Sequence, residues 1–158
     1  MAMLKDRLDA YEGQPEQMWR ERKAVSVGER GQSYQVTFVD ALPTAVYAID
    51  GGIITDNNVL KCDKLILIEG DNRQFVELFV ELKGRDIEHA ISQMEATLKN
   101  NLFKDASVKA KQARIIGRNI PRNSGRAVTE IAKKRFLANY KCRLEFKTGP
   151  AVEKNFNY

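Results

Sequence analysis

Two carboxylates and a lysine stand at the ends of two apolar, strand-like runs in the middle of this 158-residue chain. Asp63 precedes the first run, and Glu81 and Lys83 close the second. A charge in an apolar strand must be stabilised by a partner or by a metal ion, because burying it alone is costly. Carboxylate oxygens suit a hard cation such as Mg²⁺, which stabilises charge developing on a phosphate. The lysine would position or deprotonate the attacking water. A structural ion pair of Lys83 with Glu81 or Asp63 explains the same charges without a metal.

The two runs predict a β-hairpin around Gly70-Asp71-Asn72, because such residues favour a tight turn. We expect Glu69 to pair with about Arg73, which sets Asp63 opposite residues 79–81. Side chains alternate between the two faces of a strand. One face of the second strand is therefore apolar and belongs to the core: Val76, Leu78, Val80 and Leu82. The other face carries Glu77, Phe79, Glu81 and Lys83. The register that places Asp63 opposite Phe79 or Glu81 brings its carboxylate to this charged face.

A helix is expected after Gly84, with Asp86 as its N-cap and its end at about Asn100. Its inward stripe follows the i, i+3, i+4, i+7 spacing of a helix packed on a sheet: Ile87, Ala90, Ile91, Met94 and Leu98. Gln93 flanks this stripe and can reach the sheet edge. His89, the only histidine, points away from the stripe and is expected to be exposed.

The remaining elements are predicted from changes in hydrophobic period. Residues 2 to about 23 are expected to be helical, with interruptions at Gly13 and Pro15, and three strands are expected within residues 24–49. A buried strand is expected at Ala113–Gly117. A second helix follows, Arg126–Tyr140, with four residues inward: Val128, Ile131, Ala132 and Phe136. A short strand at residues 143–146 and a loosely held tail at residues 150–158 complete the chain.

The net charge of +5 hides an asymmetry between the two parts of the chain. Residues 1–98 hold 11 Lys/Arg and 17 Asp/Glu, a net charge of −6, whereas residues 99–147 hold 14 and 3, a net charge of +11. A basic segment of this density is typical of a polyanion-binding surface, although it also serves solubility. Nine basic residues are the expected nucleic-acid contacts: Lys109, Lys111, Arg114, Arg118, Arg122, Arg126, Lys133, Lys134 and Arg135.

Length and composition argue against a membrane-spanning, secreted or disulfide-rich protein. The length predicts one domain over residues 1–158. No apolar run approaches the ~20 residues that span a bilayer, and the first residues do not form a secretion signal. Cys62 and Cys142 are too few for a disulfide framework or a zinc cluster. A cytoplasmic, reduced protein is therefore expected, with both cysteines as small core residues. The chain has no phosphate-binding glycine loop and no Gly-x-Ser-x-Gly elbow.

The order of these residues and elements along the chain is a more specific signal than the tripeptide Glu81-Leu82-Lys83 alone. A strand with Asp63, a turn, a hydrophobic strand ending in Glu81-Leu82-Lys83, and a helix with Gln93 together resemble the PD-(D/E)XK nuclease superfamily. This superfamily includes restriction endonucleases and Holliday-junction resolvases. The resemblance covers roughly residues 60–118. It implies an α/β fold of the restriction-endonuclease-like kind, with a central mixed β-sheet flanked by helices in an α-β-β-β-α-β core.

The resemblance also implies roles for individual residues. Asp63 and Glu81 would be the metal ligands, Lys83 the catalytic lysine, and Gln93 the helix glutamine close to the site. A first-helix glutamate often joins such a site, and three positions remain open: Glu12, Glu16 and Glu21. The residue before Asp63 is Cys62, where the family name has proline.

The expected function is hydrolysis of DNA phosphodiester bonds with Mg²⁺, or with Mn²⁺ in its place. RNA stays open as a substrate, and a homodimer is one arrangement for cutting both strands of a duplex. No membrane partner is expected. The alternative is a non-catalytic module on the same fold that binds a nucleic acid or a protein. In that case the hairpin charges form a structural network and the basic half does the binding.

Overall fold

The computed structural model describes residue 8 and residues 15–29, 31–82, 86–118, 120 and 126–157 of the chain. These residues form a mixed α/β fold built on one seven-stranded sheet. The strands follow the order β1-β2-β3-β4-β5-β6, and β7 pairs with β2. Their bounds are β1 Gln17–Glu29, β2 Gln32–Ala48, β3 Lys64–Glu69, β4 Phe75–Leu82, β5 Val108–Gly117, β6 Cys142–Thr148 and β7 Ala151–Glu153. The α/β class expected from the sequence is confirmed.

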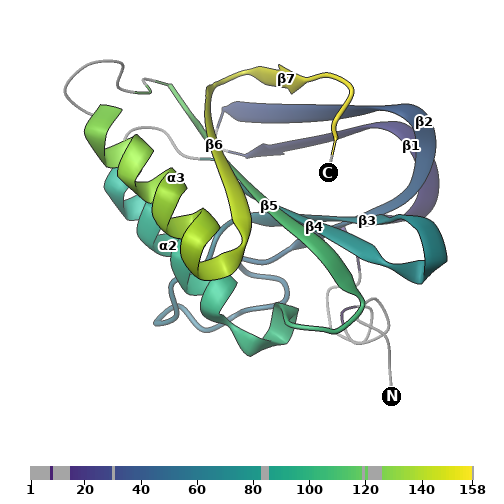
Figure 1. Ribbon diagram of the computed structural model, residues 1–158, viewed down its shortest axis with the longest axis horizontal. Coiled ribbons are helices and arrows are strands. Elements are labelled where there is room, and N and C mark those ends of the chain that lie inside the picture. The colour runs from purple at the N-terminus through teal and green to yellow at the C-terminus, as the bar shows by residue number, and fades with distance from the viewer. Residues whose placement is uncertain are drawn as a thin grey trace.

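Strand direction determines where the helices lie. The first four strands are antiparallel neighbours, whereas β4–β5 and β5–β6 are parallel pairs. Parallel neighbours need a crossover connection, and here helices supply both of them. Helix α2 (Ile87–Lys99) connects β4 to β5, and α3 (Arg126–Tyr140) connects β5 to β6. Figure 1 shows the two helices together on one side of the sheet.

The long strands β1 and β2 fold over the other side of the sheet. Arg22 pairs with Leu42 but Ala24 pairs with Thr37, so the register shifts abruptly between these pairs. The first half of β2 pairs with β7, and its second half pairs with β3. The first half of β2, the part of β1 that pairs with it, and β7 therefore form an upper layer opposite β4 and β5, as Figure 1 shows.

Two hydrophobic cores fill the spaces between these three layers. One lies between the sheet and the helices and includes Leu65, Phe79, Met94, Ile115 and Phe136. The other lies between the sheet and the upper layer: Val27, Tyr34, Val36, Ile66, Leu78, Val80 and Ile116 are among its members. Both faces of β3 and β4 are consequently buried, and these two strands lie in the middle of the strand order.

The β3–β4 hairpin forms as predicted, with a longer turn. A short 3-10 segment, η1 (Asp71–Arg73), follows Gly70, and Glu69 pairs with Phe75. The predicted pairing of Glu69 with Arg73 is wrong by two residues, because Arg73 and Gln74 belong to the turn. A shift of two residues leaves every side chain on its predicted face. Val76 and its three apolar partners on that face all lie in the second core.

Helix α2 agrees with its prediction. The Asp86 side chain accepts a hydrogen bond of 3.0 Å from the backbone N–H of His89 and so caps the helix. The predicted inward stripe is buried, and His89 is exposed. A second short 3-10 segment, η2 (Asn101–Phe103), leads from this helix toward β5.

Helix α3 also forms, with one error in its inward face. Ile131, predicted to point inward, is 60% exposed. Ala132 and Phe136 are buried as predicted, and Thr129 is buried although it was not predicted to be. These three follow an i, i+3, i+7 stripe, and Ile131 lies about 100° away from Ala132 around the helix.

The predicted first helix is wrong in its second part. Residues 17–23 belong to strand β1. Pairing with β2 supplies this segment with backbone hydrogen bonds, and such tertiary contacts override local helix propensity. Leu8 is helical and buried, and it is the one residue of the predicted helix before Pro15 that the structure describes. The expected β-β-β-α-β order is present as β2-β3-β4-α2-β5, with one additional strand, β1, in front of it.

The tail predicted to be loosely held after Pro150 packs against the sheet. Strand β7 pairs with Tyr34, Gln35 and Val36 of β2. Phe156 is buried, and its ring meets that of Phe38 edge-to-face at 6.2 Å. In the described part of the chain, no helix is both long enough and apolar enough to cross a membrane.

Candidate active site

Asp63 and Glu81 come together at the end of the hairpin away from the turn. Lys64 pairs with Val80, so the next opposed positions along the antiparallel strands are Asp63 and Glu81. Glu81 shares its face of β4 with Phe79, which packs in the core beneath the helices. Asp63 is 2% exposed and Glu81 has no exposed surface. The pairing register thus sets Asp63 and Glu81 opposite each other, and both side chains are buried.

A backbone hydrogen bond holds Asp63 against β4. The backbone N–H of Leu82 donates to Asp63 Oδ2 at 2.8 Å. Strand β3 begins at Lys64, so Asp63 lies just before the strand and outside its backbone pairing with β4. The hydrogen bond to the Asp63 side chain takes the place of a backbone hydrogen bond between the two segments. The carboxylate is therefore directed across the end of the hairpin toward the residue that follows Glu81.

Helix α2 holds the segment that leads into Asp63. Gln93 Nε2 donates to the carbonyl oxygen of Lys61 at 3.2 Å. Thr97, one turn further along, accepts from the backbone N–H of Cys62 at 2.8 Å and donates to the Gln93 carbonyl at 2.9 Å. The Gln93 amide therefore contacts the backbone two residues before Asp63. Thr97 is a second anchor that the sequence reasoning missed, although the i, i+4 spacing from Gln93 places both residues on one side of the helix.

Burial and the two neighbouring carboxylates change the pKa of the Cys62 thiol. Its pKa is raised well above the ordinary value, first by complete burial and then by the charges of Glu81 and Asp63. The thiol is therefore protonated at neutral pH and is a poor nucleophile. Cys62 acts as a small core residue, as its sequence position suggests.

The predicted site also includes Lys83, Glu12 and Glu16. Lys83 and Glu12 lie outside the described residues. Glu16 lies near β1, but its carboxylate binds Lys64 Nζ at 2.9 and 3.0 Å. Lys64 is the first residue of β3 and directly follows Asp63, so its side chain points to the opposite face of the sheet. Glu16 is thereby directed away from the two carboxylates.

Glu21 is the last of the three alternative glutamates. It is exposed on β1 and pairs in register with Pro43. Its expected helical setting is absent, because this part of the chain is a strand. Within the described residues, no group of three or more histidine, cysteine, aspartate or glutamate side chains is placed to hold a metal ion.

Glu77 is a third buried carboxylate on the same face of β4, and the sequence reasoning gave it no role. It has no exposed surface and pairs in register with Lys111 of β5. Lys111 in turn pairs with Cys142 of β6. The pKa of Cys142 is raised to about 12, mainly by burial. The nearby charges of Arg114 and Lys111 lower this pKa slightly, and that of Glu77 raises it slightly. The position of Glu77 within an otherwise apolar strand could have indicated a buried charge at this place in the sheet.

Arg114 does not belong to a nucleic-acid surface. It is 2% exposed, and its Nε donates to Glu153 Oε1 at 2.7 Å while Nη2 donates to Oε2 at 3.0 Å. The Tyr34 hydroxyl also donates to Glu153, at 2.8 Å. Burial alone would lower the pKa of Arg114, but Glu153 raises it overall. The predicted phosphate contact is wrong, because strand alternation turns this side chain into the second core.

The other predicted nucleic-acid contacts divide into two groups. Lys133 forms ion pairs with Glu130 and Glu145, and Arg135 forms one with Glu95. A second set is fully or partly exposed: Lys109, Lys111, Arg118 and Lys134. Arg122 and the side chain of Arg126 lie outside the described residues. The exposed set is accessible to a polyanion.

Comparison of the chain with protein-family models, with curated proteins and with solved structures found no match in any of the three.

Proposed function

We propose that this chain is a Mg²⁺-dependent nuclease that hydrolyses DNA phosphodiester bonds. The observation that carries the proposal is the apposition of Asp63 and Glu81 on one buried face, at the end of the hairpin where Lys83 follows in sequence. This is the arrangement expected from the resemblance to PD-(D/E)XK nucleases. Asp63 and Glu81 would be the metal ligands and Lys83 the catalytic lysine.

The donor set fits Mg²⁺ in kind. Both side chains offer carboxylate oxygens, and Mg²⁺ is commonly bound by one or two carboxylates while it keeps several waters. A cation of charge +2 would also offset the cost of burying two carboxylates near each other. When bound, the metal would polarise the phosphate and stabilise the charge that develops on it.

The residues around the pair would perform positioning. The Leu82 N–H fixes one Asp63 oxygen, and α2 fixes the backbone before Asp63 through Gln93 and Thr97. Lys83 would orient the attacking water or accept its proton. The water adds to phosphorus as one P–O ester bond breaks, and the departing oxygen takes up a proton.

The exposed basic residues would hold the strand being cut. Lys109, Arg118 and Lys134 extend over β5 and α3, in the part of the chain with the large positive charge. Contacts to phosphates of this kind produce affinity that falls with salt and depends little on sequence.

The test is a metal-dependent cleavage assay across linear, branched and single-stranded DNA and RNA, with Mg²⁺ and with Mn²⁺. Activity should require the metal and should be lost in Glu81→Gln and Lys83→Ala. Glu21→Gln is the matched control, because it removes one exposed carboxylate far from the pair in sequence. Full activity in either site variant would refute the assignment. Sedimentation of the active protein would show whether it acts as a homodimer.

A non-catalytic binding module is the second candidate. The near-complete burial of Asp63 and Glu81 favours it, because buried charges also serve as structural networks. Calorimetry separates the two candidates. Binding of Mg²⁺ or Mn²⁺ that Asp63→Ala abolishes supports the nuclease. DNA affinity with neither metal binding nor cleavage supports the module.

A further inference from the structure

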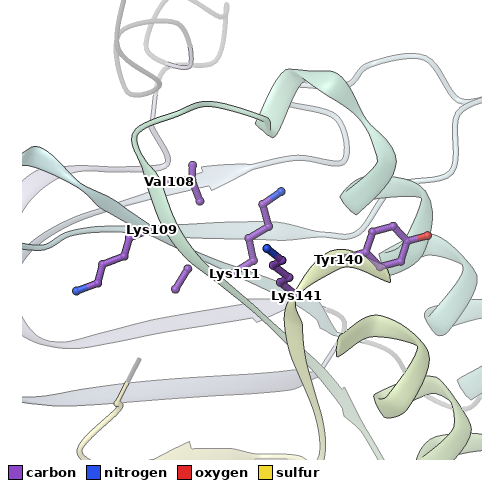
Figure 2. Close-up of a pocket in the computed structure, with 6 residues that line it drawn as sticks. Val108, Lys109, Lys111, Tyr140 and Lys141 are labelled. Carbon is purple, nitrogen blue, oxygen red and sulfur yellow. The ribbon is translucent and has the colours of Figure 1, made fainter. Parts of the chain in front are cut away.

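A hollow of about 220 Å³ opens beside the beginning of β5, where α3 passes into β6. Its lining residues come from these two places in the chain: Val108, Lys109, Ala110, Lys111, Tyr140 and Lys141. Lys111 pairs in register with Cys142, so Lys141 arrives directly beside it. Figure 2 shows the side chains of Lys111 and Lys141 near each other, the Tyr140 ring to one side with its hydroxyl directed away from them, and Lys109 projecting toward the other side of β5.

Three of the six residues that line this hollow are lysines. None of its lining residues is acidic. Lys133 and Arg135 on α3 form ion pairs with glutamates, whereas Lys111 has the buried Glu77 of β4 beside it in register. Two neighbouring ammonium groups repel each other, and an anion between them would reverse that repulsion.

The backbone places Lys141 here through an unusual conformation. Lys141 follows the last residue of α3 and has a φ of 52°, in the left-handed region. Its backbone N–H donates to the carbonyl of Leu137 at 3.1 Å, which closes the helix end. Glycine is the residue usually found at this position, because it has no Cβ. A glycine at position 141 would keep the turn and remove the ammonium group.

We propose that this hollow binds the phosphate group of a nucleotide or of a nucleic-acid strand. The ammonium groups of Lys111 and Lys141 bind the phosphate oxygens, and such charge-assisted bonds are strong. A water molecule in the liquid occupies about 30 Å³, so the hollow has room for a phosphate and part of its sugar. Val108 and the Tyr140 ring, which both pack against the core beneath the helices, form the less polar side on which the sugar lies.

This anion site is separate from the two carboxylates. Lys111 is in register with Glu77, and Glu77 lies four residues before Glu81 on β4. The two positions are therefore about 13 Å apart along the strand. Phosphate binding here needs no divalent metal, so its failure and the failure of the proposed nuclease activity are distinguishable.

The experiment measures binding to the full chain in the presence of a chelator. The probes are inorganic phosphate, a nucleoside monophosphate, and an oligonucleotide with and without a 5′-phosphate. Tighter binding of the monophosphate than of the oligonucleotides identifies a nucleotide, and the reverse order identifies a strand. Absence of measurable binding to all four probes would overturn the proposal.

Two variants and a matched control locate the site. Lys141→Gly and Lys111→Met should each weaken binding of the best probe by about tenfold, which corresponds to about 1.4 kcal/mol. Lys154→Met, an exposed lysine beyond β7, should leave it unchanged. Equal losses in all three would show that only the overall positive charge matters. A lower melting temperature in Lys141→Gly with unchanged phosphate affinity would show that Lys141 serves the helix end alone.

Discussion

Asp63 Oδ2 accepts a 2.8 Å hydrogen bond from the backbone N–H of Leu82, the residue directly after Glu81. The bond connects the segment before β3 to the last residue of β4, where the ladder has ended. It holds the buried carboxylate of Asp63 against the end of β4, next in sequence to the buried Glu81.

Asp63→Ala and Asp63→Asn should separate the structural and metal-binding roles of this side chain. Alanine leaves the buried Leu82 N–H without its acceptor, so the free energy of unfolding should fall by about 1–3 kcal/mol. Asparagine retains an acceptor oxygen and should cost less. Both should lose Mg²⁺ affinity in calorimetry. Retention of wild-type metal affinity in either variant would contradict the role of Asp63 as ligand.

Thr97 is predicted to position the backbone before Asp63. Thr97→Val keeps the shape but removes the acceptor for Cys62 N–H, and should lower stability by about 1–3 kcal/mol. If the nuclease proposal is correct, the cleavage rate should fall as well. Thr97→Ser keeps the hydroxyl and should restore the cleavage rate. Chemical denaturation and cleavage assays on the two variants provide the measurement. Equal behaviour of valine and serine would exclude a contribution from this hydrogen bond.

Arg114 is predicted to serve stability and not nucleic-acid binding. Glu153→Ala would leave the buried guanidinium without its carboxylate, and should cost about 3–5 kcal/mol. A milder variant, Arg114→Lys, should also be destabilised, because lysine cannot form the two-pronged contact. DNA affinity measured at increasing salt should keep the wild-type slope in Arg114→Lys. Arg118→Ala, at an exposed position, should reduce the slope.

Acid should weaken the same contact. Burial would raise the pKa of Glu153, but Arg114 outweighs this effect and lowers it below the ordinary value of 4.5. A carboxyl group with a lowered pKa in the folded state stabilises the fold above its unfolded pKa and loses this contribution as the pH falls through its folded pKa. The free energy of unfolding should therefore decline below about pH 4.5. The decline should be shallower in Glu153→Gln, and identical slopes in both proteins would disprove the linkage.

Both cysteines should resist alkylation in the folded protein. Burial raises the pKa of Cys142 to about 12 and that of Cys62 well above its ordinary value, so little thiolate exists at pH 8. Iodoacetamide should react only after denaturant is added, as mass spectrometry can follow. Rapid modification of the native protein would contradict the burial of these two thiols.

Local periodicity was sufficient for much of this fold. The two-residue alternation in β4 predicted which of its faces is apolar, and the 3.6-residue period in α2 predicted its buried stripe and its Asp86 cap. The hairpin joins its two strands over a short separation in sequence, so strand alternation and one turn were enough to place Asp63 beside Glu81. The two-residue error in register did not matter, because it preserved the faces.

Contacts between residues far apart in the sequence could not be predicted from the periodicity of single elements. The segment 17–23 is a strand because it pairs with residues 42–46 of β2, and nothing in its own sequence specifies that partner. Arg114 is buried because Glu153, 39 residues later, returns to meet it.

The sequence by itself determined the α/β class, the central hairpin, and the pairing of two carboxylates at its end. These follow from the side-chain period within each element and from a single short turn. Only the tertiary structure decided that Glu16 binds Lys64, that Arg114 is internal, and that Lys111 meets Lys141 beside a hollow. Each of these depends on which strands become neighbours, and that choice is made by the burial of the whole sheet between two layers.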